Sequence, residues 1–87
     1  MPFVVREVQP TPNPNAVKLV LDRRVSEDPQ SFRTPDAAEG HDLASRLMTL
    51  KGVTAVLLLH DFVTINKSPE ARWADITSRA KRILAKA

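Results

Sequence analysis

The sequence contains no cysteine, and this absence removes several kinds of chemistry from consideration. Without thiols the chain can form no disulfide, cannot hold a metal through thiolates and has no cysteine nucleophile. Glycine is almost as rare, with only Gly40 and Gly52 among the 87 residues. A phosphate-binding loop of the nucleotide-binding type needs several closely spaced glycines, so the sequence excludes that class of site as well.

Long apolar runs are also missing. No segment approaches the roughly 18 apolar residues of a membrane-spanning helix, and residues 1–8 do not have the form of a signal peptide. We therefore expect a cytoplasmic protein. The chain is long enough for one domain with a single modest core, and no linker or internal repeat divides residues 1–87.

Charge is distributed unevenly along the chain, which has a formal net charge of +3. Residues 1–68 contain eight basic and eight acidic side chains, so this part of the chain is neutral. The excess lies beyond Ser68, where five basic residues accompany only Glu70 and Asp75. The C-terminal segment is therefore the part that carries the charge to attract an anionic partner.

Alternating apolar residues predict four strands in two hairpins. The segment 3–8 is rich in β-branched residues, and in both 3–8 and 17–22 alternate side chains fall on one face. The apolar segment 53–59 and its return at 62–66 form a second hairpin, with His60-Asp61 as a tight turn between them. The polar segment from 23 to 34 has the composition of a loop, with one short edge strand at 31–33.

Apolar residues at helical spacing predict two helices. The first spans 42–51, ends at Gly52 and follows a short turn at 35–39 that begins like a helix with Thr34-Pro35-Asp36. The second helix opens at Ser68-Pro69-Glu70, where serine is the expected N-cap. The predicted buried stripes are Leu43, Ala44, Leu47 and Leu50, with Met48 at the margin, and Trp73, Ile76, Thr77, Ala80, Ile83 and Leu84.

The order strand, strand, helix, strand, strand, helix indicates an α+β fold. Helices gathered on one side of antiparallel hairpins form a two-layer sandwich, because each helix must bury its apolar stripe against the sheet. We expect an antiparallel sheet of about four strands with two helices on one face, in ββαββα order.

Residues able to support catalysis are few. The pairs His41-Asp42 and His60-Asp61 are candidates for metal ligands or a general base, but their spacing matches no known kind of metal site. A helix cap and a hairpin turn explain the two pairs better. No serine lies in a recognisable nucleophile elbow. We expect no enzymatic activity, no catalytic residue, no metal and no cofactor.

A basic strip lies beside the apolar stripe of the last helix. It consists of Arg72, Arg79, Arg82 and Lys86 and is interrupted by Asp75. Such a strip suits nucleic acid, an anionic membrane surface or an acidic protein partner, whereas a simpler reading is a solvated helix face with cations near its C-terminus. Nucleic acid is disfavoured because aromatic residues are not interleaved with the basic ones. Membrane binding is disfavoured because the apolar stripe must cover the sheet.

The loop between the first two strands has an unusual composition, Thr11-Pro12-Asn13-Pro14-Asn15. The prolines fix φ at about −65°, and the Thr and Asn side chains can form hydrogen bonds with the nearby backbone. A rigid loop of defined shape is therefore predicted. The loop is longer than a tight hairpin needs. Either it is a recognition surface or it braces the first hairpin.

This loop begins a set of motifs that extends over nearly the whole chain. TPNPNAVK at 11–18 is followed by DAAEG at 36–40 ahead of a helix, then by Gly52-Val53, DFVTI at 61–65 and Trp73. Together these motifs resemble the N-terminal domain of Nfu/NifU-like iron–sulfur cluster scaffold proteins. The likeness covers residues 3 to 84.

The resemblance implies more about partners than about chemistry. Full-length members of the family carry a second domain, whose Cys-x-x-Cys motif holds an iron–sulfur cluster and passes it to client proteins. We expect a stand-alone chain without that domain, and a chain without cysteine is not expected to ligate a cluster, because thiolates are the main ligands. The implied function is a non-catalytic protein-interaction module that contacts assembly factors, a cluster carrier or client proteins.

Two surfaces are therefore candidates for binding. The predicted partner-binding residues are Thr11, Asn13, Asn15, Lys18, Asp61 and Phe62. They form one surface only if the loop and the end of the second hairpin lie on the same side of the molecule. The alternative is a small basic binder of nucleic acid or an acidic partner, through Arg72, Arg79, Arg82 and Lys86.

Overall fold

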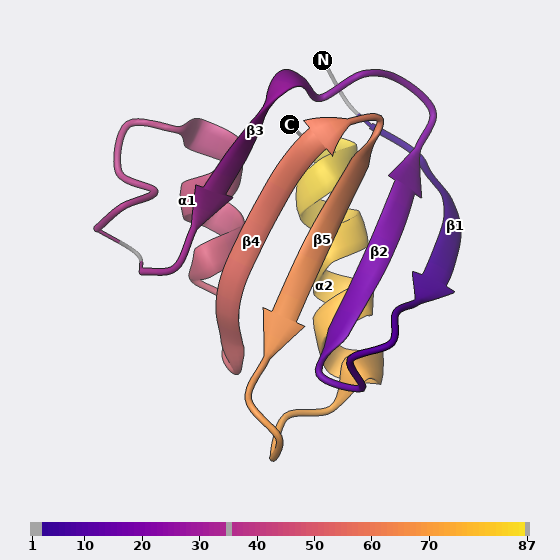
Figure 1. The fold of residues 1–87 in the computed structure, drawn as a ribbon, viewed down its shortest axis with the longest axis vertical. Helices are drawn as coiled ribbons and strands as arrows, with labels where there is room; N and C mark the ends of the chain where they lie inside the picture. The colour runs from indigo at the N-terminus through magenta and orange to yellow at the C-terminus, as the bar shows by residue number, and fades with distance from the viewer. Residues whose placement is uncertain (1–2, 35, 87) are drawn as a thin grey trace.

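A computed structural model describes residues 3–34 and 36–86 (Figure 1). Within these residues the chain forms an antiparallel sheet covered by helices on one face, which confirms the α+β class. The elements in chain order are β1 (Val5–Pro10), β2 (Ala16–Leu21), β3 (Ser26–Phe32), α1 (Asp42–Met48), β4 (Val53–His60), β5 (Phe62–Lys67) and α2 (Trp73–Lys86).

The sheet has the strand order β1-β2-β5-β4-β3. Figure 1 shows both helices behind it, α1 behind β3 and β4 and α2 behind β5 and β2. The prediction of about four strands in ββαββα order was wrong in one respect. The described residues form five strands, because the polar segment before α1 is a full strand, and the order is βββαββα.

The additional strand, β3, is polar because it lies at the edge of the sheet and pairs only with β4. Its register shifts between Ser26 and Gln30, which leaves room for Pro29 where no ladder bond is required. The Ser26 hydroxyl donates to the Asp28 carbonyl at 2.6 Å and accepts from the Gln30 side chain at 3.1 Å. These side-chain bonds replace part of the ladder and hold the bulge.

The predicted start of the second helix is a turn instead, whereas the turn predicted before the first helix is present. The carbonyl of Ser68 accepts from the N–H of Ala71 at 3.1 Å, so 68–71 is a separate turn and α2 begins at Trp73. The hydroxyl of Thr34 accepts from the N–H of Ala37 at 3.1 Å, which gives the expected short turn. Pro35, the middle residue of the Thr34-Pro35-Asp36 motif, lies outside the described residues.

The first helix is shorter than predicted. It ends at Met48 rather than Lys51, and the next four residues form turns before β4 begins. Gly52 has φ +92°, so it is the residue in the left-handed region that completes the change of direction.

The core lies between the sheet and the two helices. Inward-facing residues of the three central strands, β2, β5 and β4, meet the apolar stripes of α1 and α2. The largest fully buried side chains among the described residues are Leu19, Leu21, Leu47, Leu58, Ile65, Leu84, Val56 and Val63. Of the stripe predicted for α2, Ile76, Ala80 and Leu84 are fully buried and the other members are half-buried. No helix within the described residues is long and apolar enough to cross a bilayer.

A reciprocal pair of hydrogen bonds fastens the start of the first hairpin. The N–H of Val4 donates to Oδ1 of Asp22 at 3.0 Å, and the N–H of Asp22 donates to the Val4 carbonyl at 3.0 Å. The bond from Val4, aided by the nearby Arg23 guanidinium, lowers the pKa of Asp22 below its usual value of 3.8.

We expect Asp22→Asn to be less stable than the wild type near neutral pH, with the difference vanishing in acid. A depressed pKa adds stability above the usual pKa, and this contribution is lost as the pH falls through the folded-state value. Asparagine can still accept the Val4 bond, so the comparison isolates the charge. Urea midpoints measured across the acid range would check this, and a constant gap between the two proteins would contradict it.

Candidate functional site

The loop of residues 11–15 (the 11–15 loop) has the internal hydrogen bonds that its composition predicts. The Thr11 hydroxyl accepts a hydrogen bond from the N–H of Asn13 at 3.2 Å and donates one to the Ala16 carbonyl at 3.0 Å. The Asn13 side chain accepts from the N–H of Asn15 at 2.9 Å, and the Asn13 carbonyl accepts from the N–H of Ala16 at 3.0 Å. Because two prolines restrict the same backbone, the loop has a defined shape.

Lys67 and Trp73 attach the loop to the body of the protein. Lys67, at the end of β5, is only 9% exposed, and its ammonium donates to Oδ1 of Asn15 at 3.2 Å and to the Ser68 carbonyl at 3.3 Å. Nζ lies 5.4 Å from the centre of the Trp73 ring. The indole N–H of Trp73 donates to the Pro14 carbonyl at 3.1 Å. A buried ammonium needs such partners, so the lysine and the loop stabilise each other.

A groove of about 450 Å³ lies where the loop meets α2. Thr11 and Asn13 line it from the loop, Val8 from β1, and Trp73 and Ala74 from the first turn of α2. None of its lining residues in the described chain is charged. The groove therefore favours an apolar or neutral group over an ion.

The groove borders a free edge of the sheet. Among the residues that the structure describes, β1 is the end strand and pairs only with β2, so the backbone groups on its other side are open to a further strand. Val8, which is 39% exposed, lies along this edge. An edge and an adjoining apolar groove can bind an extended segment, through main-chain hydrogen bonds on one side and side-chain pockets on the other.

Two other predicted residues meet on the open face of the sheet. Nζ of Lys18 lies 4.2 Å from the centre of the Phe62 ring, which is a cation–π contact between neighbouring strands. Both side chains are half-exposed, whereas Leu19 and Val63 beside them point into the core. Lys18 and Phe62 therefore belong to the face opposite the helices.

Asp61 and the 11–15 loop lie at opposite ends of β2 and β5. The N–H of Leu21 donates to the Asp61 carbonyl at 2.7 Å at one end, and the N–H of Lys67 donates to the Asn15 carbonyl at 2.8 Å at the other. Figure 1 shows this separation, with the β1–β2 loop and the β4–β5 turn at opposite ends of the strands. The condition for one continuous surface is not met, because the six predicted residues fall in three places.

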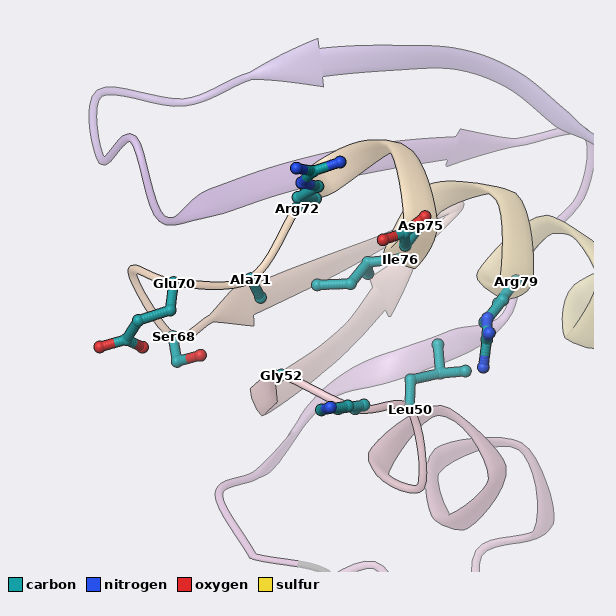
Figure 2. A pocket seen from close by; sticks show the side chains of 10 residues that line it. Leu50, Gly52, Ser68, Glu70, Ala71, Arg72, Asp75, Ile76 and Arg79 are labelled. Atoms are coloured by element: carbon teal, nitrogen blue, oxygen red, sulfur yellow. The ribbon is translucent and has the colours of Figure 1, made fainter.

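The basic strip is exposed along α2 on the side away from the groove. Arg72, Arg79, Arg82 and Lys86 are all exposed. Arg72 and Arg79 also line a second cavity, shown in Figure 2, together with residues that follow α1. The strip and the loop are therefore separate candidate surfaces.

Both His-Asp pairs have the structural roles that the sequence favours. Nδ1 of His41 accepts from the N–H of Ala44 at 3.1 Å and caps α1. His60 occupies the turn between β4 and β5 with φ +51°, a conformation that tight hairpin turns require. Within 3–34 and 36–86 there is no group of three or more His, Asp or Glu side chains that could hold a metal ion.

Sequence reasoning missed Lys67 and Val8 as parts of the site. The signal for Lys67 is the period of two along β5, which puts it on the same side as Val63 and Ile65. No comparable signal marks Val8, whose place beside Ala74 depends on how α2 crosses the sheet.

Comparison with known protein families identifies the family to which the chain belongs. A family model described as "Scaffold protein Nfu/NifU N terminal" matches residues 5–87. The chain belongs to this Nfu/NifU N-terminal family. The match includes the 11–15 loop, both helices and every strand described above, so the family assignment expected from the motifs is confirmed.

Known relatives of this Nfu/NifU N-terminal domain are longer than the chain. The mitochondrial NFU1 iron–sulfur cluster scaffold homolog of Homo sapiens is 38% identical over 69 residues, which are 78% of this chain and 27% of that protein. The uncharacterized protein YpgR of Bacillus subtilis is 26% identical over 78 residues, which are 88% of this chain and 21% of that protein. The chain thus spans 27% or less of the length of these two relatives.

A solved structure supports the fold. The crystal structure of protein SAV1430 from Staphylococcus aureus superposes with a TM-score of 0.76 at 18% sequence identity and covers 92% of this chain and 96% of that chain. At this level of identity the likeness concerns the fold of the Nfu/NifU N-terminal domain alone.

Proposed function

We propose that this Nfu/NifU N-terminal domain is a non-catalytic protein-interaction module that serves iron–sulfur cluster assembly or delivery without ligating the cluster itself. The observation that carries the proposal is the braced 11–15 loop, which forms one end of an uncharged groove beside the free edge of β1. A relative named as an iron–sulfur cluster scaffold suggests the process. The lack of cysteine in the sequence supports a role other than cluster ligation.

In this proposal a partner contributes an extended segment that pairs with β1. One of its apolar side chains enters the groove between Val8, Trp73 and Ala74, and the polar rim of the loop, Thr11 and Asn13, fixes its position. The brace from Lys67 and Trp73 has a direct consequence for affinity. A loop that is already ordered loses little conformational entropy when the partner binds.

The partners we propose are proteins: assembly factors, a separately encoded cluster carrier, or the client proteins that receive clusters. Lys18, Phe62 and Asp61 offer further contact points for a partner that extends over the open face or the far end of the sheet. Their role in binding stays a prediction, and so does the cytoplasmic location.

We expect Ala74→Gln to reduce capture of the cognate partner by about tenfold, because the longer side chain occupies the groove that the partner needs. Ala74 is exposed in the first turn of α2, so the change leaves the core intact. The matched control is Ala85→Gln, an identical change at an exposed position of the same helix, about 16 Å further along. The measurement is quantitative mass spectrometry of proteins captured from native lysate by each variant.

The proposal predicts a group of iron–sulfur assembly, carrier or client proteins that the wild type and Ala85→Gln capture and Ala74→Gln loses. Capture of proteins unrelated to cluster biogenesis would contradict the proposed process. Equal capture by all three baits would contradict the groove as the site and would leave the loop as a brace for the first hairpin.

A further inference from the structure

A second cavity, which shares no lining residue with the groove, lies between the turn after α1 and the start of α2 (Figure 2). Its volume is about 550 Å³. The floor is apolar and consists of Leu50, Gly52, Ala71 and Ile76, of which Ile76 is 2% exposed. A floor of this kind accepts an aliphatic side chain of moderate size.

The rim of the cavity is charged. Lys51, Arg72 and Arg79 contribute three cations against the two carboxylates of Glu70 and Asp75. In Figure 2 the Arg79 side chain points from α2 towards the turn that carries Leu50, across the mouth of the cavity. Within the described residues none of the three cations forms an ion pair. The rim therefore has cationic groups available to an anionic partner.

The excess of positive charge continues from the cavity along α2. Arg72, Arg79 and Lys86 are seven residues apart and so follow one side of the helix, with Arg82 beside them. All four are exposed, and this side of the helix extends for about 21 Å. The cavity is at one end of a linear cationic strip.

We infer that this surface binds an acidic segment of a partner protein. An aliphatic side chain of the segment enters the cavity above Leu50 and Ile76, while its carboxylates face the strip from Arg79 to Lys86. The two classes of group on the partner match the two parts of the surface, an apolar floor and cations that have no ion-pair partner among residues 3–34 and 36–86.

An acidic protein segment explains this surface better than nucleic acid does. A phosphate backbone has no aliphatic group for the apolar floor, whereas a protein segment can supply an aliphatic side chain next to its carboxylates. The nearby aromatic ring, that of Trp73, is held by its bond to Pro14 and by Lys67, and it lines the other groove. It is not placed to stack on a base beside the strip.

The test uses the whole chain and a defined probe. The probe is a fluorescein-labelled, glutamate-rich helical peptide of about sixteen residues, long enough to follow the strip, with one central leucine. Fluorescence anisotropy gives its affinity at low and moderate ionic strength, and amide NMR shifts locate it on the surface. Two comparison probes are the same peptide with serine in place of leucine and a single-stranded oligonucleotide of similar charge.

Arg79→Glu and Lys81→Glu form a matched pair of variants. Both residues are exposed on α2 and the change in net charge is the same, but Lys81 lies on the groove side of the helix, outside the strip. We expect Arg79→Glu to weaken peptide binding at least about fivefold and Lys81→Glu less than about twofold. Replacing leucine by serine in the peptide should also weaken binding about fivefold.

Amide shifts centred on 50–52 and 71–79 would support the inference. Any of four results would overturn it: no binding of the acidic peptide at low ionic strength, equal losses from the two charge reversals, no effect of the leucine, or tighter binding of the oligonucleotide than of the peptide. Circular dichroism of both variants confirms that each remains folded.

Discussion

Gly52→Ala is expected to destabilise the domain by about 3 kcal/mol, because the added methyl group is strained by the backbone and crowded by a neighbour. Gly52 has φ +92°, a conformation in which a Cβ atom costs about 1–2 kcal/mol. The added Cβ would also lie 2.5 Å from the Cβ of Ala71, and the backbone must move to relieve that contact. Relief of such overpacking typically costs a further 1–3 kcal/mol or so.

The second glycine provides a matched control. Gly40 has φ +93°, but a Cβ added there would meet no atom within 4 Å. Gly40→Ala should therefore show the cost of the backbone conformation alone, about 1–2 kcal/mol. Urea or guanidinium denaturation of the two variants measures the difference. Equal losses would mean that the added Cβ at position 52 is accommodated beside Ala71 without a steric cost.

The second large effect is expected at the base of the 11–15 loop. Asn15→Ala should lower the free energy of unfolding by about 2 kcal/mol, because the buried ammonium of Lys67 loses one of its two oxygen acceptors. The Ser68 carbonyl and the ring of Trp73 remain, but they do not complete the set of bonds that an ammonium requires.

A double-mutant cycle separates this bond from other effects of the substitution. In a Lys67→Met background the ammonium is absent, and Asn15→Ala should then cost only about 0.5 kcal/mol, which gives a coupling energy of about 1.5 kcal/mol. Methionine keeps an apolar side chain of similar length against Trp73. Equal effects of Asn15→Ala in both backgrounds would show that the Lys67 bond does not stabilise the loop.

The parts of the fold that the sequence predicts are those with strong periodicity. The hairpin of β4 and β5 and the stripe of α2 follow from the spacing of residues such as Val63, Ile65 and Ile76, because burial of one face imposes a period on the sequence. The structure confirms these elements with small changes at their ends.

The length of the edge strand was the main error, because a short strand was predicted at 31–33 whereas β3 spans Ser26–Phe32. β3 lies at the border of the sheet, where one side has no strand partner, so its residues need not be apolar or alternate. Pro29 in its middle argues for a loop unless the edge position is known. The start of α2 was misplaced for a related reason, since Ser68-Pro69-Glu70 has the same composition in a turn as at a cap.

The candidate site was predicted only in part, because its components come from distant segments. The composition of the 11–15 loop predicts the bonds from Thr11 and Asn13, which are local in sequence. The contact between Asn15 and Lys67 joins residues 52 positions apart, and the bond from Trp73 to Pro14 joins residues 59 apart. Such pairs depend on strand register and helix position, which a single sequence does not specify.

Site-specific photo-crosslinking from the groove tests most directly whether a partner protein of iron–sulfur cluster assembly or delivery binds there. A photoreactive phenylalanine analogue at Ala74 faces the groove, and the same analogue at Ala85 serves as the exposed control on α2. After irradiation in native lysate, we expect cross-links from position 74, but not from 85, to proteins of iron–sulfur cluster assembly or delivery. Cross-links that are the same at both positions, or that join position 74 only to unrelated proteins, would contradict this expectation.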